Sequence, residues 1–132
     1  MRTFDRSVRQ VLVDTFHRVC EGVASAHGVD VEVRYDEEYP VTVNDPGATD
    51  RFFRIAKQAI DPTLVSVLPE PSMGGEDFSY YALRVPACFF LVGLCPPTKE
   101  RYPLLHSPDF DFNDEALPTG IELMCRLALD EG

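Results

Sequence analysis

The chain has 132 residues, of which 45% are apolar, and this suits one soluble domain with a modest core. Lys and Arg total 12 against 22 Asp and Glu, a formal charge of −10, and no cluster of basic residues provides the footprint that nucleic acid or an anionic membrane requires. No apolar run approaches the ~20 residues of a membrane-spanning helix, so we expect neither nucleic acid nor a membrane as a partner.

The cysteines and the N-terminus bear on the cellular compartment. No pair of the four cysteines has the C-x-x-C spacing of a structural zinc site. The first ten residues lack the apolar segment of a secretory signal. We therefore expect a reducing, cytoplasmic setting.

The first predicted unit is a long helix followed by a strand. Asp5 can cap the free N–H groups of the first helical turn, and Gly28 is placed to end the helix in a left-handed conformation. Apolar residues between them recur at intervals of three and four, which predicts an amphipathic face. Residues 29–35 then alternate apolar and polar side chains, as a half-buried strand does. With residues 2–4 as the end of a preceding strand, this makes a strand–helix–strand unit.

The second half of the chain alternates helices and strands. Asp45 and Pro46 together start a helix that is expected to run to about residue 60 and to bury Phe52, Phe53, Ala56 and Ile60. Further elements are expected in order as a short strand at 64–68, a helix at 76–84, a strand at 87–93 and a helix at about 114–130. Pro118 lies either in the first turn of the last helix or at a kink, and the sequence does not distinguish these.

This order predicts an α/β fold with a layered sheet. The segment ACFFLVG at 87–93 is apolar on both faces, as a strand buried between helix layers is. Such a strand needs neighbours on both sides, and this sequence offers few. Either the chain pairs with another copy or part of the domain lies elsewhere.

One histidine stands out in LLHSPDFDFNDE at 104–115. His106 follows a predicted buried strand, and loops beyond strand ends are where sites tend to lie in open α/β sheets. Its acidic neighbours could orient the ring or cap the last helix. Taken alone, these residues favour an ordinary surface-loop histidine. His17 and His27 do not share a helix face and are interpreted as structural.

The second candidate is MGGEDF at 73–78. Two glycines let the backbone approach a ligand closely, and the N–H groups that follow could hold an anion at a helix start. The opposing interpretation is a tight turn whose acidic residues favour the first helical turn. No nucleophile elbow, phosphate-binding loop or dinucleotide fingerprint occurs in the sequence.

Several stretches together resemble one family. RTFD, YPVTVND, PSMGGEDFSYY, VPACFFLVG and LLHSPDFDFNDEALPTG occur in this order, as they do in the C-terminal part of metal-dependent amidohydrolases and metallopeptidases of the hippurate hydrolase, auxin-conjugate hydrolase and N-acyl-amino-acid hydrolase type. The resemblance covers nearly the whole chain. It implies that residues 1–40 are the second half of a lid or dimerisation domain and that residues 41–132 close the catalytic α/β domain.

The resemblance also implies site residues. His106 matches the last metal ligand of the family, Arg2 matches a lid arginine that holds the substrate carboxylate, and Gly75 and Glu76 match a loop that lines the substrate cleft. The intact family uses a divalent metal, zinc or manganese, whose activated water hydrolyses the amide bond of a small N-acyl amino acid.

The remaining ligands and the general base of that family are absent from this sequence, so we predict no catalytic residue in it and no tight metal binding by the chain alone. The chain is then a fragment of the enzyme, half of a split enzyme that meets a separate N-terminal half, or a standalone interaction module. Self-association through exposed strand edges is also expected. A small acidic binding domain without catalytic ancestry is the remaining alternative.

Overall fold

The computed structural model describes residues 2–130, and these fall into two compact units. Unit 1 is Met1–Val43 with Leu68–Pro86, and unit 2 is Asn44–Val67 with Ala87–Gly132. Each unit therefore combines two separate stretches of the chain. The predicted division between residues 40 and 41 lies close to the first of these boundaries, and the structure also groups residues 68–86 with the N-terminal stretch. The assignment of residues 1–40 to a lid stays a prediction.

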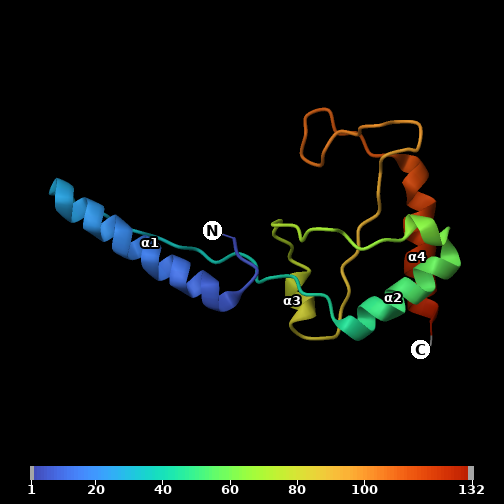
Figure 1. Cartoon of the computed structure of the whole chain (residues 1–132), viewed down its shortest axis with the longest axis horizontal. Coiled ribbons are helices and arrows are strands. Elements are labelled where there is room, and N and C mark those ends of the chain that lie inside the picture. The colour runs from blue at the N-terminus through green and yellow to red at the C-terminus, as the bar shows by residue number, and fades with distance from the viewer. Residues whose placement is uncertain (1, 131–132) are drawn as a thin grey trace. The chain divides into compact units, whose positions relative to one another are not determined.

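Unit 1 begins with the long helix α1, Arg6–His27, whose predicted ends are confirmed (Figure 1). The Asp5 carboxylate accepts hydrogen bonds from Ser7 N at 2.7 Å and Val8 N at 3.1 Å. Gly28 ends the helix with φ 63°, the conformation that favours glycine. Ala24 is buried, whereas the α1 apolar face is 39–64% exposed and consists of Val8, Val11, Leu12, Phe16, Val19 and Val23. Helix formation was thus predictable, but unit 1 does not cover this face.

Unit 2 is built on two helices, α2 (Pro46–Ala59) and α4 (Leu117–Leu129). Asp45 caps α2 by accepting from Ala48 N at 2.8 Å, with Pro46 in the first turn as predicted. The 3₁₀ turn η1, Pro62–Leu64, follows α2, and η2, Asp114–Ala116, precedes α4. Pro118 lies in the first turn of α4, which is the first of the two positions that the sequence allowed for it.

The core of unit 2 lies between α2 and α4, which pack against each other (Figure 1). Ile55, Ala56 and Leu123 are buried there. Phe52 is half-buried and stacks on Phe90, with ring centroids 4.6 Å apart, so the extended segment at 87–93 also contacts α2. Removal of such apolar surface from water is the main stabilisation available to this unit.

Two arginines of α2 tie the end of α4 in place. Arg51 Nε donates to Asp130 Oδ2 at 2.7 Å, and Arg51 Nη2 donates to Leu127 O at 2.9 Å. Arg54 reaches both carboxylate oxygens of Asp130, at 3.1 and 2.8 Å. The hydrogen bonds from Arg54 and then Arg51 lower the pKa of Asp130 from 3.8 to about 2.

The Asp130 network predicts a specific loss of stability in acid. The pKa of Asp130 is lower in the folded chain than in the unfolded chain. The contribution of Asp130 to the free energy of unfolding is therefore present above pH 3.8 and is lost as the pH falls toward about 2. Asp130→Asn is therefore expected to lose less stability than the unmodified chain between pH 5 and pH 3, measured by urea unfolding. Glu122→Gln is the control, since Glu122 pairs with Arg126 at 2.8 Å on the exposed side of the same helix. Equal pH dependence in the Asp130 variant and the unmodified chain would contradict the account.

The predicted strands are extended chain without strand pairing in residues 2–130. The segments concerned are 29–35, 65–68 and 87–93, while Leu64, where the second predicted strand was to begin, is the last residue of η1. A strand ladder needs a neighbour with free N–H and C=O groups. At Phe89 the side chain of Asn44 takes that role, since Asn44 Nδ2 donates to Phe89 O at 2.9 Å and Phe89 N donates to Asn44 Oδ1 at 2.8 Å. The layered α/β sheet therefore stays a prediction.

The helix predicted at 76–84 is shorter in the structure. The α3 helix spans Ser79–Ala82, and residues 76–78 lead into it through a turn. The Ser79 side chain is fully buried and donates to Glu76 O at 2.6 Å, which replaces part of the expected first turn. None of the helices in residues 2–130 combines the length and apolar character needed to span a bilayer.

Candidate functional site

His106 belongs to the loop at 94–113, which leads from the segment at 87–93 to η2 in unit 2 (Figure 1). Ser107 N donates to Leu104 O at 2.9 Å, so residues 104–107 form a closed turn. His106 is exposed and has φ 68°, and it is the one non-glycine residue with positive φ in the described part of the chain. Positive φ at the third residue of a turn usually requires glycine.

A histidine at such a position costs stability. For an L-residue the left-handed conformation costs about 1–2 kcal/mol relative to the ordinary one. Strained residues of this kind concentrate at functional sites, where a side chain must be held in a defined place. The left-handed backbone at His106 is an observation that the sequence resemblance does not supply, while the role of the ring stays a prediction.

We expect glycine to be the least costly replacement for His106. His106→Gly relieves the left-handed strain, whereas His106→Ala keeps it, so the alanine variant should be less stable by about 1 kcal/mol. Urea unfolding of the two variants under identical conditions measures this difference. An alanine variant as stable as the glycine variant would show that His106 is not held in this conformation.

His106 does not form a metal site by itself. Among residues 2–130 no group of three or more His, Cys, Asp or Glu side chains is arranged to hold a metal ion. His17 and His27 belong to α1 in unit 1. The described residues therefore do not fit a complete divalent-metal centre, which needs several protein ligands.

The three residues predicted to bind substrate all belong to unit 1. Arg2 Nη1 donates to Met73 O at 2.8 Å, which places the guanidinium group on the loop that carries Gly75 and Glu76. A Cβ atom at Gly75 would lie 3.0 Å from Tyr39 Cδ2, so glycine permits the close approach of the Tyr39 ring. The structure brings these three residues to one loop, while their roles toward a substrate stay predictions.

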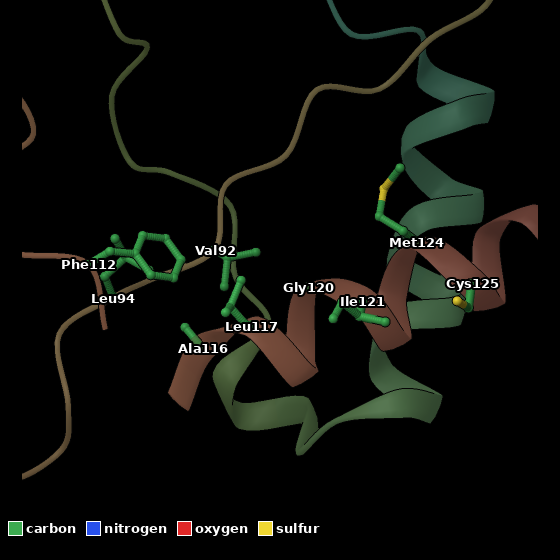
Figure 2. A pocket seen from close by; sticks show the side chains of 9 residues that line it. All are labelled: Val92, Leu94, Phe112, Ala116, Leu117, Gly120, Ile121, Met124 and Cys125. Carbon is green, nitrogen blue, oxygen red and sulfur yellow. The ribbon is translucent and has the colours of Figure 1, made fainter. Parts of the chain in front are cut away.

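Unit 2 also contains an apolar groove of about 510 Å³ (Figure 2). The groove is lined by residues of α4 and of its neighbouring segments: Val92, Leu94, Phe112, Ala116, Leu117, Gly120, Ile121, Met124 and Cys125. None of them offers a charged group, so the groove suits packing rather than chemistry. The sequence analysis did not identify it, although the spacing of Leu117, Ile121 and Met124 marks an apolar face of α4.

The α4 helix is therefore apolar on two faces. Leu123 is buried against α2, while Ile121 and Met124 on the groove side are exposed. The remaining side of α4 carries the exposed ion pair between Glu122 and Arg126. Within residues 2–130, α2 covers one side of α4, while Ile121 and Met124 on the groove side stay exposed.

Comparison with known proteins places the chain in a family. The model of peptidase family M20/M25/M40 matches residues 5–130. The Bacillus subtilis protein YhaA, which carries a provisional amidohydrolase name, is 37% identical over 97% of this chain and 32% of its own length. Thermostable carboxypeptidase 2 of Saccharolobus solfataricus is 30% identical over 98% of the chain and 32% of its own length. Hippurate hydrolase of Campylobacter jejuni is 25% identical over the same shares.

These matches cover nearly all of this chain and much less of the relatives. The chain spans about a third of the length of the curated proteins that it matches. No solved structure matches it significantly. Because the family model spans the region from the cap of α1 to the end of α4, the chain belongs to peptidase family M20/M25/M40.

Proposed function

We propose that this chain is the C-terminal portion of a metal-dependent amidohydrolase that hydrolyses N-acyl amino acids. Two relatives carry names of this kind: hippurate hydrolase, and the N-acetylcysteine deacetylase of Bacillus subtilis, which is 29% identical to the chain. Hippurate and N-acetylcysteine are both amino acids with an acyl group on nitrogen. The observation that carries the proposal is His106, an imidazole held at a strained position within the segment that resembles the last metal ligand of the family.

Arg2 is proposed to bind the carboxylate of the substrate. Its Nη1 atom is occupied by Met73 O, and within residues 2–130 its other donors have no hydrogen-bond partner. A guanidinium group can present two parallel N–H donors to a carboxylate, which is the geometry that this task requires. Gly75 and Glu76, on the same loop, are proposed to line the substrate cleft.

The activity itself requires groups outside this chain. We propose that the metal is zinc or manganese. Its further protein ligands and the general base are proposed to come with the portion of the relatives that this chain does not match. That portion would also supply neighbours for the extended segments and complete the layered α/β sheet, with residues 1–40 as part of a lid. The four free thiols are compatible with a cytoplasmic location.

Three arrangements can account for the short chain: a fragment, half of a split enzyme, or a non-enzymatic interaction module. We favour the fragment. The upstream reading frame distinguishes them, because a frame that encodes the missing ligands favours fragmentation. The exposed α1 apolar face also predicts self-association of the isolated chain. Light scattering that shows a monomer at micromolar concentration would contradict self-association.

The proposed function is tested by assaying the isolated chain. With zinc, manganese or cobalt, we expect no turnover of hippurate or N-acetyl amino acids, because one imidazole cannot bind and orient a catalytic metal. Turnover comparable with that of intact relatives would show that the site is complete within this chain. In that case the proposal that its other ligands lie elsewhere is wrong.

A further inference from the structure

Residues 37–39, which follow the extended segment of unit 1, are held by two helices. The Arg9 guanidinium group of α1 forms an ion pair with the Glu37 carboxylate, and the Arg9 side chain is only 11% exposed. The Tyr80 hydroxyl of α3 donates to the main-chain oxygen of Glu38. All of these residues belong to unit 1. The segment is therefore fixed although it is not itself helical.

Tyr39, the last residue of this segment, presents its ring to the loop at 73–76. Its main-chain oxygen accepts from Arg9 Nη2 at 3.3 Å, so the backbone that carries the ring is held. The ring meets that of Tyr80 edge to face, with centroids 6.3 Å apart and an interplanar angle of 69°. A Cβ atom at Gly75 would have three Tyr39 ring atoms as its nearest neighbours, at 3.0, 3.8 and 3.9 Å. Glycine thus lets the main chain of the loop rest against this ring.

The same loop is held at both ends. At its start, Arg2 Nη1 donates to Met73 O at 2.8 Å. At its end, the buried Ser79 hydroxyl donates to Glu76 O at 2.6 Å. The Tyr39 ring contacts the loop between these two points. Loss of the ring would therefore free the centre of the loop and, through Met73, change the surroundings of the Arg2 guanidinium group.

We infer that Tyr39 is a positioning residue for substrate binding: its ring holds the main chain of Gly75 and thereby the loop that Arg2 contacts. This inference rests on the proposed function, which assigns Arg2 and Gly75 to substrate binding. Tyr39 is not a catalytic residue, because its ring supports the main chain of the loop. Every contact that carries the inference lies within unit 1. Binding groups need a packed support of this kind to stay within about 0.5 Å of their working positions.

The test uses the whole 132-residue chain with two replacements of Tyr39. Tyr39→Leu removes the ring, whereas Tyr39→Phe keeps it, and both keep the main-chain oxygen that accepts a hydrogen bond. Tyr81→Leu is the matched control, because Tyr81 is an exposed tyrosine of the same unit and the atoms nearest to Gly75 are not its own.

Two NMR signals report the outcome. The Hα resonances of Gly75 report the ring, because an aromatic ring shifts the resonances of protons that lie against it. The side-chain N–H resonance of Arg2 during a titration with hippurate alone reports binding of the substrate carboxylate.

In Tyr39→Leu we expect the Gly75 resonances to move toward those of an unstructured glycine. The half-saturating hippurate concentration should rise about three-fold to ten-fold, the effect of one aromatic contact. Tyr39→Phe should resemble the unmodified chain in both signals, and Tyr81→Leu should change neither. If Tyr39→Leu does not fold, Gly75→Ala takes its place, because the added Cβ would meet the ring at 3.0 Å and displace the loop. It should weaken the hippurate response by a similar factor.

A hippurate response of Tyr39→Leu, or of Gly75→Ala in its place, like that of the unmodified chain would overturn the inference, whether or not the Gly75 resonances move. Loss of the response in Tyr39→Phe as well would also overturn it, because the ring is then not the cause. If hippurate leaves the Arg2 resonance of the unmodified chain unchanged, the proposed role of Arg2 is wrong. The Gly75 resonances alone then decide whether Tyr39 holds the loop.

Discussion

A chimera that joins the first two thirds of YhaA to this chain is expected to hydrolyse N-acyl amino acids, and His106→Ala is expected to lower its kcat/KM by about 10³-fold. The chain matches 32% of that relative's length at 37% identity. With the C-terminal position proposed above, the chimera would restore a full family length. Several kcal/mol of transition-state stabilisation depend on a correctly held catalytic metal, and loss of one ligand removes much of it. Steady-state kinetics on hippurate and a set of N-acetyl amino acids measure the effect.

The control for this substitution is His27→Ala in the same chimera. His27 is an exposed histidine at the end of α1, and neither the structure nor the resemblance gives it a role in the site. Its replacement should leave kcat/KM within about two-fold, because a substitution on the surface away from the proposed site has a small effect. A His106→Ala chimera that retains activity close to that of its parent would contradict the assignment of His106 as a ligand.

The second large effect concerns the two apolar faces of α4. Leu123→Ala is expected to lower the free energy of unfolding of the isolated chain by about 3 kcal/mol, because it leaves a cavity between α2 and α4. Ile121→Ala on the same helix should change it by less than about 0.5 kcal/mol, because that side chain is 61% exposed in the groove. Urea unfolding followed by circular dichroism measures both values.

The same pair of substitutions behaves differently in the chimera if the groove is a packing surface. With the rest of the catalytic domain present, Ile121 is expected to be buried, and Ile121→Ala should then cost about 2 kcal/mol or more. An Ile121→Ala variant that stays neutral in the chimera would show that nothing packs into the groove. A neutral Leu123→Ala variant in the isolated chain would contradict the observed core.

Local chemistry allowed the helix ends to be predicted from the sequence. Asp5 and Gly28 bound α1, and Asp45 with Pro46 starts α2, because capping depends on residues within one turn of the helix end. Local chemistry does not determine the strands in this way, because a strand forms only when another segment pairs with it and that segment is distant in the sequence. At Phe89 the structure gives that place to the Asn44 side chain.

The candidate site, like the fold, could be predicted from the sequence only in part. His106 was identified through resemblance, while its left-handed backbone has no sign in the local sequence, because nothing short of the turn itself reveals φ. The contact between Arg2 and Met73 joins residues 71 positions apart, a separation that no periodicity predicts. The groove could not be predicted from the spacing of Leu117 and Ile121 alone, because an apolar helix face becomes a groove only where neighbouring segments, here those of Val92 and Phe112, form its walls.

The central claim is that His106 is a ligand of a metal site whose other ligands lie outside this chain. Metal content after dialysis against zinc, measured by mass spectrometry, tests it most directly on three proteins: the isolated chain, the YhaA chimera and the chimera with His106→Ala. We predict that the chimera retains zinc, that His106→Ala loses at least part of it, and that the isolated chain retains none. Stoichiometric zinc on the isolated chain, or equal zinc in both chimeras, would contradict the claim.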